Sequence, residues 1–193
     1  MTFADALAPH YDDALRFCRS LCAGWGPDEA EDVLHDAMIR AYDRFNQLRD
    51  PDAFRPWLFR TIARTHHNAR RWRFWRRLVP FDSGAEGGPA IYDRSHADPE
   101  ARALLRALAA LPERDRTTLL LFEVGGFSVD EVAKIVGDRT SSAAKSRLSR
   151  TRSRLRDALD SDSRTGTLAS SPGRTLEEQV GPLLPPPPGA EPC

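Results

Sequence analysis

The sequence predicts an all-α protein: two small helical domains joined by a flexible linker, with a helix-turn-helix in the second domain. Three observations favour this fold class. Apolar residues recur at the three- and four-residue spacing of a buried helix face, and strand-like alternation is scarce. Gly, Ser and Pro gather between the two helical stretches and again near the end of the chain. Hydrophobic residues make up 40% of the 193 residues, which is enough for two small cores.

The first domain, residues 1–80, is predicted to hold three helices. The first spans 5–23 and ends where two glycines and a proline follow. The second spans 28–45, and its first five residues include four carboxylates, which favour the positive end of a helix dipole. The third begins just after residue 50 and runs to about Leu78, with its prolines confined to the start, where a helix tolerates them.

A linker and a tail flank the second domain. Residues 81–98 are acidic and rich in Gly, and they are predicted to form the flexible linker. Residues 99–160 return to helical periodicity and form the second domain. Residues 161–193 contain a run of four prolines, and we expect a disordered Pro-rich tail with local polyproline II structure.

The second domain contains the pattern of a helix-turn-helix. Ser128 and Glu131 have the spacing of a capping box, and they precede apolar residues on one helical face. Gly137 is placed to end this short helix, and a longer basic helix is predicted over 141–159.

Small hydroxyl side chains lie on the outer face of this longer helix, with cations beside them. Small side chains let a helix approach the floor of the major groove, while cations meet phosphates and an Arg can read guanine. A solvated basic face is the alternative interpretation. The residues expected to contact duplex DNA are Arg139, Ser142, Lys145, Ser146, Arg147, Ser149 and Arg150.

Cations and aromatic residues alternate along the third predicted helix. Aromatic rings can stack on unpaired bases while cations follow the phosphate backbone, so this pattern favours binding to an opened DNA strand. The alternative is that the Trp residues are core and the Arg residues are solvated; Trp72 in particular is expected on the inward face. The candidate contacts are Trp57, Arg60, Arg64, His67, Arg71, Phe74 and Trp75.

The second predicted helix presents acidic residues around an outward-facing Ile. The net charge of the chain is zero, but residues 1–50 carry ten Asp or Glu against five Arg, whereas 51–80 carry eight Arg against one Asp. An acidic surface with an apolar centre can dock a basic protein partner, although single exposed apolar residues are also common. The candidate docking residues are Asp32, His35, Asp36, Ile39, Arg40 and Asp43.

Three segments together resemble the extracytoplasmic-function (ECF) subfamily of bacterial RNA polymerase sigma factors. They are the acidic helix over 30–42, the Phe-Arg-Pro-Trp-Leu-Phe-Arg run at 54–60 with the Arg-rich stretch after it, and the helix-turn-helix from Leu111 to Arg152. Their order and spacing also agree with the family, and the resemblance covers roughly residues 5–160.

The resemblance implies that the two domains bind different partners. It implies that the first domain binds the β′ clamp helices of core RNA polymerase and helps to melt the -10 promoter element. The second domain would bind the -35 element, the linker would pass close to the polymerase active site, and the β subunit would also be contacted. An anti-sigma factor is a further implied partner. Departures from the family include His35, Met38, Ala143 and Ala144.

Two other functions remain open from the sequence. A sigma-like module could sequester an anti-sigma factor without driving transcription, and a plain helix-turn-helix regulator would explain the second domain alone. We expect no enzyme, because no phosphate-binding Gly loop or nucleophile motif is apparent. No catalytic residue, metal, cofactor or small-molecule substrate is therefore expected. Three cysteines and no secretory signal favour the cytoplasm, with Cys18 and Cys22 as core residues.

Overall fold

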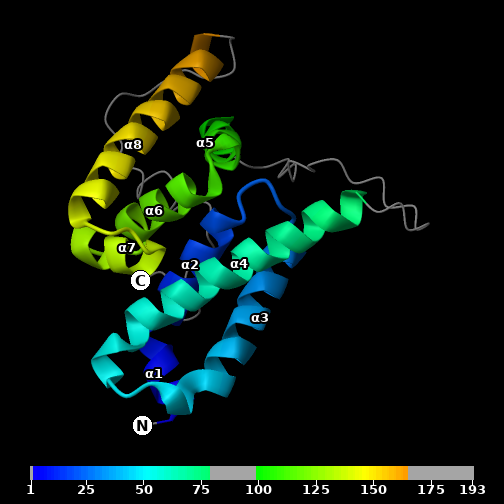
Figure 1. Cartoon of the computed structure of the whole chain (residues 1–193). Helices are drawn as coiled ribbons and strands as arrows, with labels where there is room; N and C mark the ends of the chain where they lie inside the picture. The colour runs from blue at the N-terminus through cyan, green and yellow to red at the C-terminus, as the bar shows by residue number, and fades with distance from the viewer. Residues whose placement is uncertain (1, 79–98, 165–193) are drawn as a thin grey trace, which may run out of the picture.

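The computed structural model describes residues 2–78 and 99–164, without the side chains at 27, 74–78, 99 and 162–164, and the regular structure in these residues is entirely helical. Figure 1 shows the order of the helices along the chain. The first domain holds α1 (Phe3–Leu7), η1 (Ala8–His10), α2 (Tyr11–Leu21), α3 (Pro27–Arg44), η2 (Phe45–Gln47), η3 (Pro51–Ala53) and α4 (Phe54–Leu78). The second holds α5 (Pro99–Ala110), α6 (Glu113–Glu123), α7 (Val129–Val136) and α8 (Ser141–Arg164).

The all-α prediction is confirmed, but the predicted helix over 5–23 is divided. It comprises α1, the short 3₁₀ turn η1 and α2. Pro9 explains the interruption, because it lacks the backbone N–H that a continuous α-helix would use. The last helix is longer than predicted, since α8 continues to Arg164.

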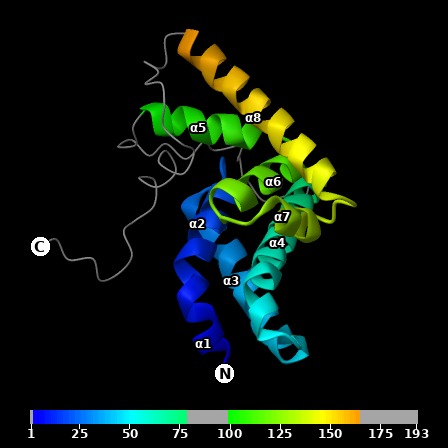
Figure 2. The same cartoon turned by 90° about the vertical axis from the view of Figure 1, so that its left-hand side faces the viewer.

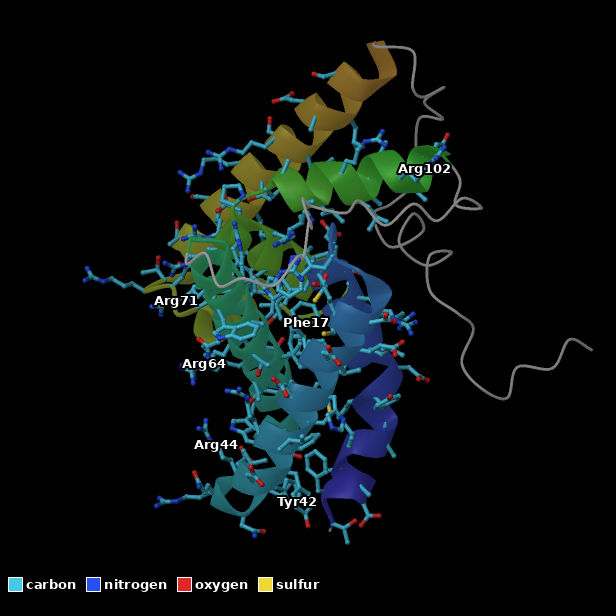
Figure 3. All side chains as sticks on the ribbon, turned by 90° about the vertical axis from the view of Figure 1, so that its right-hand side faces the viewer. Phe17, Tyr42, Arg44, Arg64, Arg71 and Arg102 are labelled. Atoms are coloured by element: carbon cyan, nitrogen blue, oxygen red, sulfur yellow. The ribbon has the colours of Figure 1, made fainter. Side chains whose placement is uncertain are left out.

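The core of the first domain lies between α2, α3 and α4. Phe17 of α2 and Phe59 of α4 are fully buried, with ring centroids 5.1 Å apart. Figure 3 shows Phe17 enclosed among the helices. Cys18 and Cys22 are also buried, as expected for core cysteines. The hydrogen bond with Cys18, together with burial, raises the pKa of Cys22 well above its ordinary value, so this thiol is held in its protonated form.

The second domain forms around α6 and the helix-turn-helix. Its core includes Leu119 and Leu120 of α6, Val132 of α7 and Leu148 of α8. The predicted capping box is confirmed: the Ser128 side chain accepts a hydrogen bond from the Glu131 backbone N–H, and the Glu131 carboxylate accepts one from the Ser128 N–H.

The turn after α7 depends on a left-handed glycine. Gly137 has φ +73°, a backbone conformation that glycine adopts without the steric cost of a Cβ atom. The Asp138 N–H then donates to the Ala133 carbonyl at 2.8 Å, which closes the end of α7. The residues at 128, 131 and 137 therefore determine where α7 begins and ends.

The two domains lie against each other. Figures 1 and 2 show α6 and α7 between the first domain and α8, with α5 and α8 on the side away from α1. Helices α2 and α4 contact α6, and α4 also contacts α7. The sequence predicted two domains but not this packing. The predicted linker over 81–98 lies outside the described residues, as do residues 165–193 of the predicted tail. Residues 161–164, predicted to be disordered, belong to α8 instead.

Candidate nucleic-acid interface

The outer face of α8 is basic and open. Ser142, Lys145, Ser146, Ser149 and Arg150 are all exposed. The opposite face of the helix buries an apolar and Thr stripe against the rest of the second domain. This is the orientation that the sequence predicted for these five residues, and the exposed Arg139 sits in the turn before them.

Arg147 is placed differently from its neighbours on α8. Only 20% of its side chain is exposed, and its guanidinium lies against two carboxylates, Asp115 of α6 and Asp138 of the turn. The hydrogen bonds to Asp138, which outweigh the effect of burial, raise the pKa of Arg147. Its predicted contact with DNA therefore competes with an internal ion pair.

A ridge of cations runs along one side of α4. Arg60, Arg64, His67 and Arg71 are exposed, as their spacing predicted. Figure 3 shows Arg64 and Arg71 reaching outward on the same side of the molecule. Trp57, at the start of the ridge, is partly buried and packs against the core. Phe74 and Trp75 belong to the ridge by sequence, but their side chains lie outside the described residues.

Trp72 contradicts its predicted place in the core. Its side chain is 60% exposed, and it lies beside Arg71 on the outer part of α4. The buried stripe of α4 ends before this position: Thr65 is buried and Ala69 is partly buried against the core, whereas Trp72 is exposed. Helical periodicity alone therefore assigned Trp72 to the wrong environment: it is an exposed aromatic residue next to the cations.

The acidic face of α3 is exposed as predicted. The side of α3 that carries Ala30, Val33 and Ala37 is buried in the first domain. Ile39 and Tyr42, 47% and 66% exposed, form an apolar centre. The charged and polar residues around this centre are all exposed: Asp32, His35, Asp36, Arg40 and Asp43.

Glu113 joins the two domains through polar contacts with α4. One carboxylate oxygen lies 3.0 Å from Nδ1 of His67 and 3.4 Å from a guanidinium nitrogen of Arg70. The other lies 3.4 Å from Nδ1 of the fully buried His66. Burial raises the pKa of Glu113, but the two histidines lower it more, to about 2, so the carboxylate is ionised at neutral pH.

His66 and Arg116 are buried at the same boundary. Among the residues that the structure describes, neither ring nitrogen of His66 has a hydrogen-bond partner of good geometry, and the same is true of Nε of Arg116. The His66 ring lies against Trp25, with centroids 4.8 Å apart. Burial lowers the pKa of His66, which favours the neutral ring. Arg116 spans the boundary by donating to the Ala23 carbonyl at 3.4 Å.

A second junction between the domains is built on Arg55 of α4. Its guanidinium donates a short hydrogen bond to the Gly125 carbonyl and lies 4.2 Å from the ring centroid of Phe127. The Phe127 ring also meets Phe59 edge to face, with centroids 5.0 Å apart. Sequence periodicity gave no sign of this junction, because its residues are about 70 positions apart.

Family models match both domains. Sigma-70 region 2 matches residues 7–76, and sigma-70 region 4 matches residues 101–155. The chain is 33% identical over 153 residues to a probable RNA polymerase sigma factor, RfaY, from Xanthomonas campestris pv. campestris; this match covers 75% of the chain and 37% of the relative.

Two further relatives are also named as RNA polymerase sigma factors. The ECF RNA polymerase sigma factor SigM of Mycobacterium tuberculosis is 30% identical over 128 residues, or 66% of this chain and 63% of the relative. The RNA polymerase sigma-H factor of Pseudomonas aeruginosa is 32% identical over 148 residues, covering 68% of this chain and 73% of that factor. The chain thus spans 37% of RfaY and 63% of SigM.

Solved structures share the fold. The sigma factor RpoE of Bartonella quintana, solved in complex with the anti-sigma factor NepR, matches with a TM-score of 0.63 at 22% identity, over 82% of this chain and 99% of that one. CnrH, solved with the cytosolic domain of CnrY, matches with a TM-score of 0.60 at 25% identity, over 83% and 88%. The chain belongs to the ECF subfamily of the sigma-70 family of RNA polymerase sigma factors.

Proposed function

We propose that this protein is a transcription initiation factor that binds core RNA polymerase and directs it to promoters. One observation carries the proposal: an exposed acidic helix, a cation ridge and a helix-turn-helix with an open basic face occur together in one ECF sigma chain. A helix-turn-helix regulator would need only the last of these. The protein supplies binding energy and no bond-making chemistry, and the polymerase is the catalyst.

The second domain would read the -35 element with α8. Arg150 lies on the open face among small Ser side chains, where it can reach base edges in the major groove. Lys145 lies on the same face and suits a phosphate contact. Arg139, Ser142, Ser146 and Ser149 would complete this surface.

The cation ridge of α4 would hold the opened -10 strand. Arg60, Arg64, His67 and Arg71 can follow the phosphate backbone, and exposed aromatic faces can stack on unpaired bases. The exposed Trp72 extends this surface beyond the residues predicted from the sequence. Trp57, Phe74 and Trp75 remain candidates for stacking.

The acidic face of α3 would bind a basic surface of core polymerase, as the family resemblance implies for the β′ clamp helices. Its apolar centre at Ile39 can be buried in the contact while the surrounding carboxylates pair with cations. The cytoplasm, where polymerase acts, is the compartment that this proposal requires.

The packed arrangement of the domains has to open for both promoter elements to be bound. The -35 and -10 positions are about 25 base pairs apart, which is about 85 Å at 3.4 Å per pair. A compact chain of this size has a radius of gyration of about 15 Å, hence a diameter of about 40 Å. We infer that the contacts at Glu113 and Arg55 break when the factor engages polymerase and promoter.

Two variants test the proposal. Asp36→Arg places a cation in the acidic face of α3 and is expected to abolish co-purification with core polymerase while the protein stays folded by circular dichroism. Arg150→Ala is expected to change which -35 sequences are selected from a random library by the protein bound to core polymerase. Unchanged results for both variants would overturn the proposal.

Sequestration of an anti-sigma factor without transcription is the second candidate. The two structural neighbours were solved with a bound anti-sigma factor or a cytosolic domain, and a protein of this kind is a proposed partner here. The retained cations of α4 and α8 favour the active factor, because sequestration alone does not use them.

A further inference from the structure

Two shielded carboxylates lie beneath the proposed recognition helix. The side chain of Asp138, in the turn before α8, is 4% exposed, and that of Asp115, near the start of α6, is 12% exposed. Carboxylates shielded to this degree need cationic or hydrogen-bonding partners to remain ionised. Three arginines from α6 and α8 supply them.

Arg147 is the arginine that joins both carboxylates. Two of its nitrogens, Nε and one terminal nitrogen, donate to Asp138 at 3.4 and 3.0 Å. The other terminal nitrogen donates to Asp115 at 3.2 Å. The guanidinium thus uses all three of its nitrogens on two acids that belong to different elements, which a single ammonium group cannot reproduce.

Outer partners complete the cluster. Arg154 donates to Asp115 at 2.6 Å, and Arg114 donates to Asp138 at 2.7 Å. The same terminal nitrogen of Arg114 lies 3.3 Å from the Gly137 carbonyl and 3.4 Å from that of Val136. The cluster therefore fixes the end of α7, the turn and one face of α8 to α6.

The helical position of Arg147 agrees with this role. It lies three residues after Ala144 and four before Thr151, both fully buried, so it stands at the edge of the inward face. A phosphate contact would require the guanidinium to leave two shielded carboxylates. Lys145 and Arg150, by contrast, make no such contacts among the hydrogen bonds and ion pairs of the described residues, and both are exposed.

We propose that Arg147 is a positioning residue, which sets the angle of α8 on DNA by bridging Asp115 and Asp138, and that it does not itself contact DNA. This inference rests on the proposed role of α8 in reading the -35 element. It replaces the contact predicted for Arg147 from the sequence.

The first experiment compares Arg147→Lys with Arg156→Lys, the same substitution at an exposed position of α8, in the full chain bound to core polymerase. The probe is a promoter duplex that the wild-type holoenzyme has selected from a random library, and affinity is measured across a salt series. Arg147→Lys keeps the charge but cannot bridge, so we expect affinity to fall about tenfold with an unchanged salt slope. Arg156→Lys also replaces a guanidinium by an ammonium group, but outside the cluster, and should bind like the wild type. Wild-type affinity for Arg147→Lys would overturn the bridge.

The second experiment removes a negative charge and measures whether DNA binding becomes stronger or weaker. Asp138→Asn removes a negative charge close to DNA, which by electrostatics alone should strengthen binding. The bridge predicts the opposite: affinity for the selected duplex falls about fivefold, because Arg147 loses one of its two anchors. Asp157→Asn, an exposed acid of α8 outside the cluster, is the matched control and should bind as well as the wild type or slightly better. Stronger binding by Asp138→Asn would refute the proposal.

A third variant separates this proposal from the function on which it rests. Lys145→Ala should lower the magnitude of the salt slope by about 0.9 if α8 meets phosphate. If Lys145→Ala has no effect, the role of α8 in DNA binding fails. If Lys145→Ala lowers the slope and Arg147→Ala lowers it equally, α8 binds DNA but Arg147 is a phosphate contact, and the positioning role fails alone.

Discussion

Arg55→Ala is expected to shift the protein from the packed arrangement of its domains toward the open one. Arg55 belongs to α4, yet its guanidinium donates to the Gly125 carbonyl and lies over the Phe127 ring in the second domain. Alanine removes both contacts, together with the ion pair of Arg55 with Asp13 at 3.7 Å inside the first domain, and leaves the cores of the two domains intact. The variant therefore acts on the junction between the domains.

The size of the shift follows from the two lost contacts. A hydrogen bond from a charged donor contributes about 1.5–3 kcal/mol, and the lower end applies because 28% of the Arg55 side chain is exposed. A cation–π contact at such a site adds about 0.5–1 kcal/mol. The loss of about 2 kcal/mol corresponds to about a 30-fold change in the ratio of packed to open molecules.

Energy transfer between two dyes measures this ratio. Exposed positions on opposite domains, Asn46 and Asp160, can carry the dyes after Cys193→Ser removes the thiol of the tail. Arg16→Ala is the control: Asp13 pairs with both Arg16 and Arg55, so this variant tests the loss of an Asp13 ion pair without the loss of the contacts between Arg55 and the second domain. We expect lower transfer for Arg55→Ala than for the control. Equal transfer in both variants would show that Arg55 does not hold the domains together.

Three further predictions concern the junction and the turns. Because burial lowers the pKa of His66 in the packed form, that form is most stable above pH 6.5 and opens as the pH falls below 6.5. Energy transfer between the dyes should therefore decrease below pH 6.5, and His66→Gln should remove this pH dependence. Ser128→Ala removes a helix cap and should lower Tm by about 2–4 °C in a thermal melt. Gly24→Ala, at φ +84° and close to Ala109, should cost about 1–2 kcal/mol in urea unfolding.

Each of the three has a result that would contradict it. For His66, it is a pH response that persists in His66→Gln. For Ser128→Ala, it is a melting temperature equal to that of the wild type. For Gly24→Ala, it is an unchanged urea midpoint.

Local sequence signals predicted the elements that depend on local chemistry. The cap at Ser128 and Glu131 and the left-handed Gly137 are properties of a few neighbouring residues, and the structure confirms them. The exposed face of α3 followed from its apolar stripe in the same way. Pro9 was the local signal missed, and it divides the first predicted helix.

The features that the sequence did not predict depend on what lies beside each helix. Periodicity gives the inward face of α4 but not where its covering helices end, so Trp72 was placed in a core that does not extend to it. Arg147 was grouped with the outward cations because helical periodicity does not show its acidic partners: Asp115 belongs to another helix and Asp138 to the turn before α8. The contacts of Arg55 and Glu113 between the domains are equally long-range, and no local pattern encodes them.

Transcription from a library of random promoter fragments, with purified full-length protein and bacterial core RNA polymerase, tests the central claim most directly. The proposed function predicts RNA that begins at defined sites only when the protein is present. It also predicts that Asp36→Arg abolishes these transcripts. The account would be contradicted if core polymerase together with the protein started no RNA at a defined site on any fragment, while the protein still bound an anti-sigma factor.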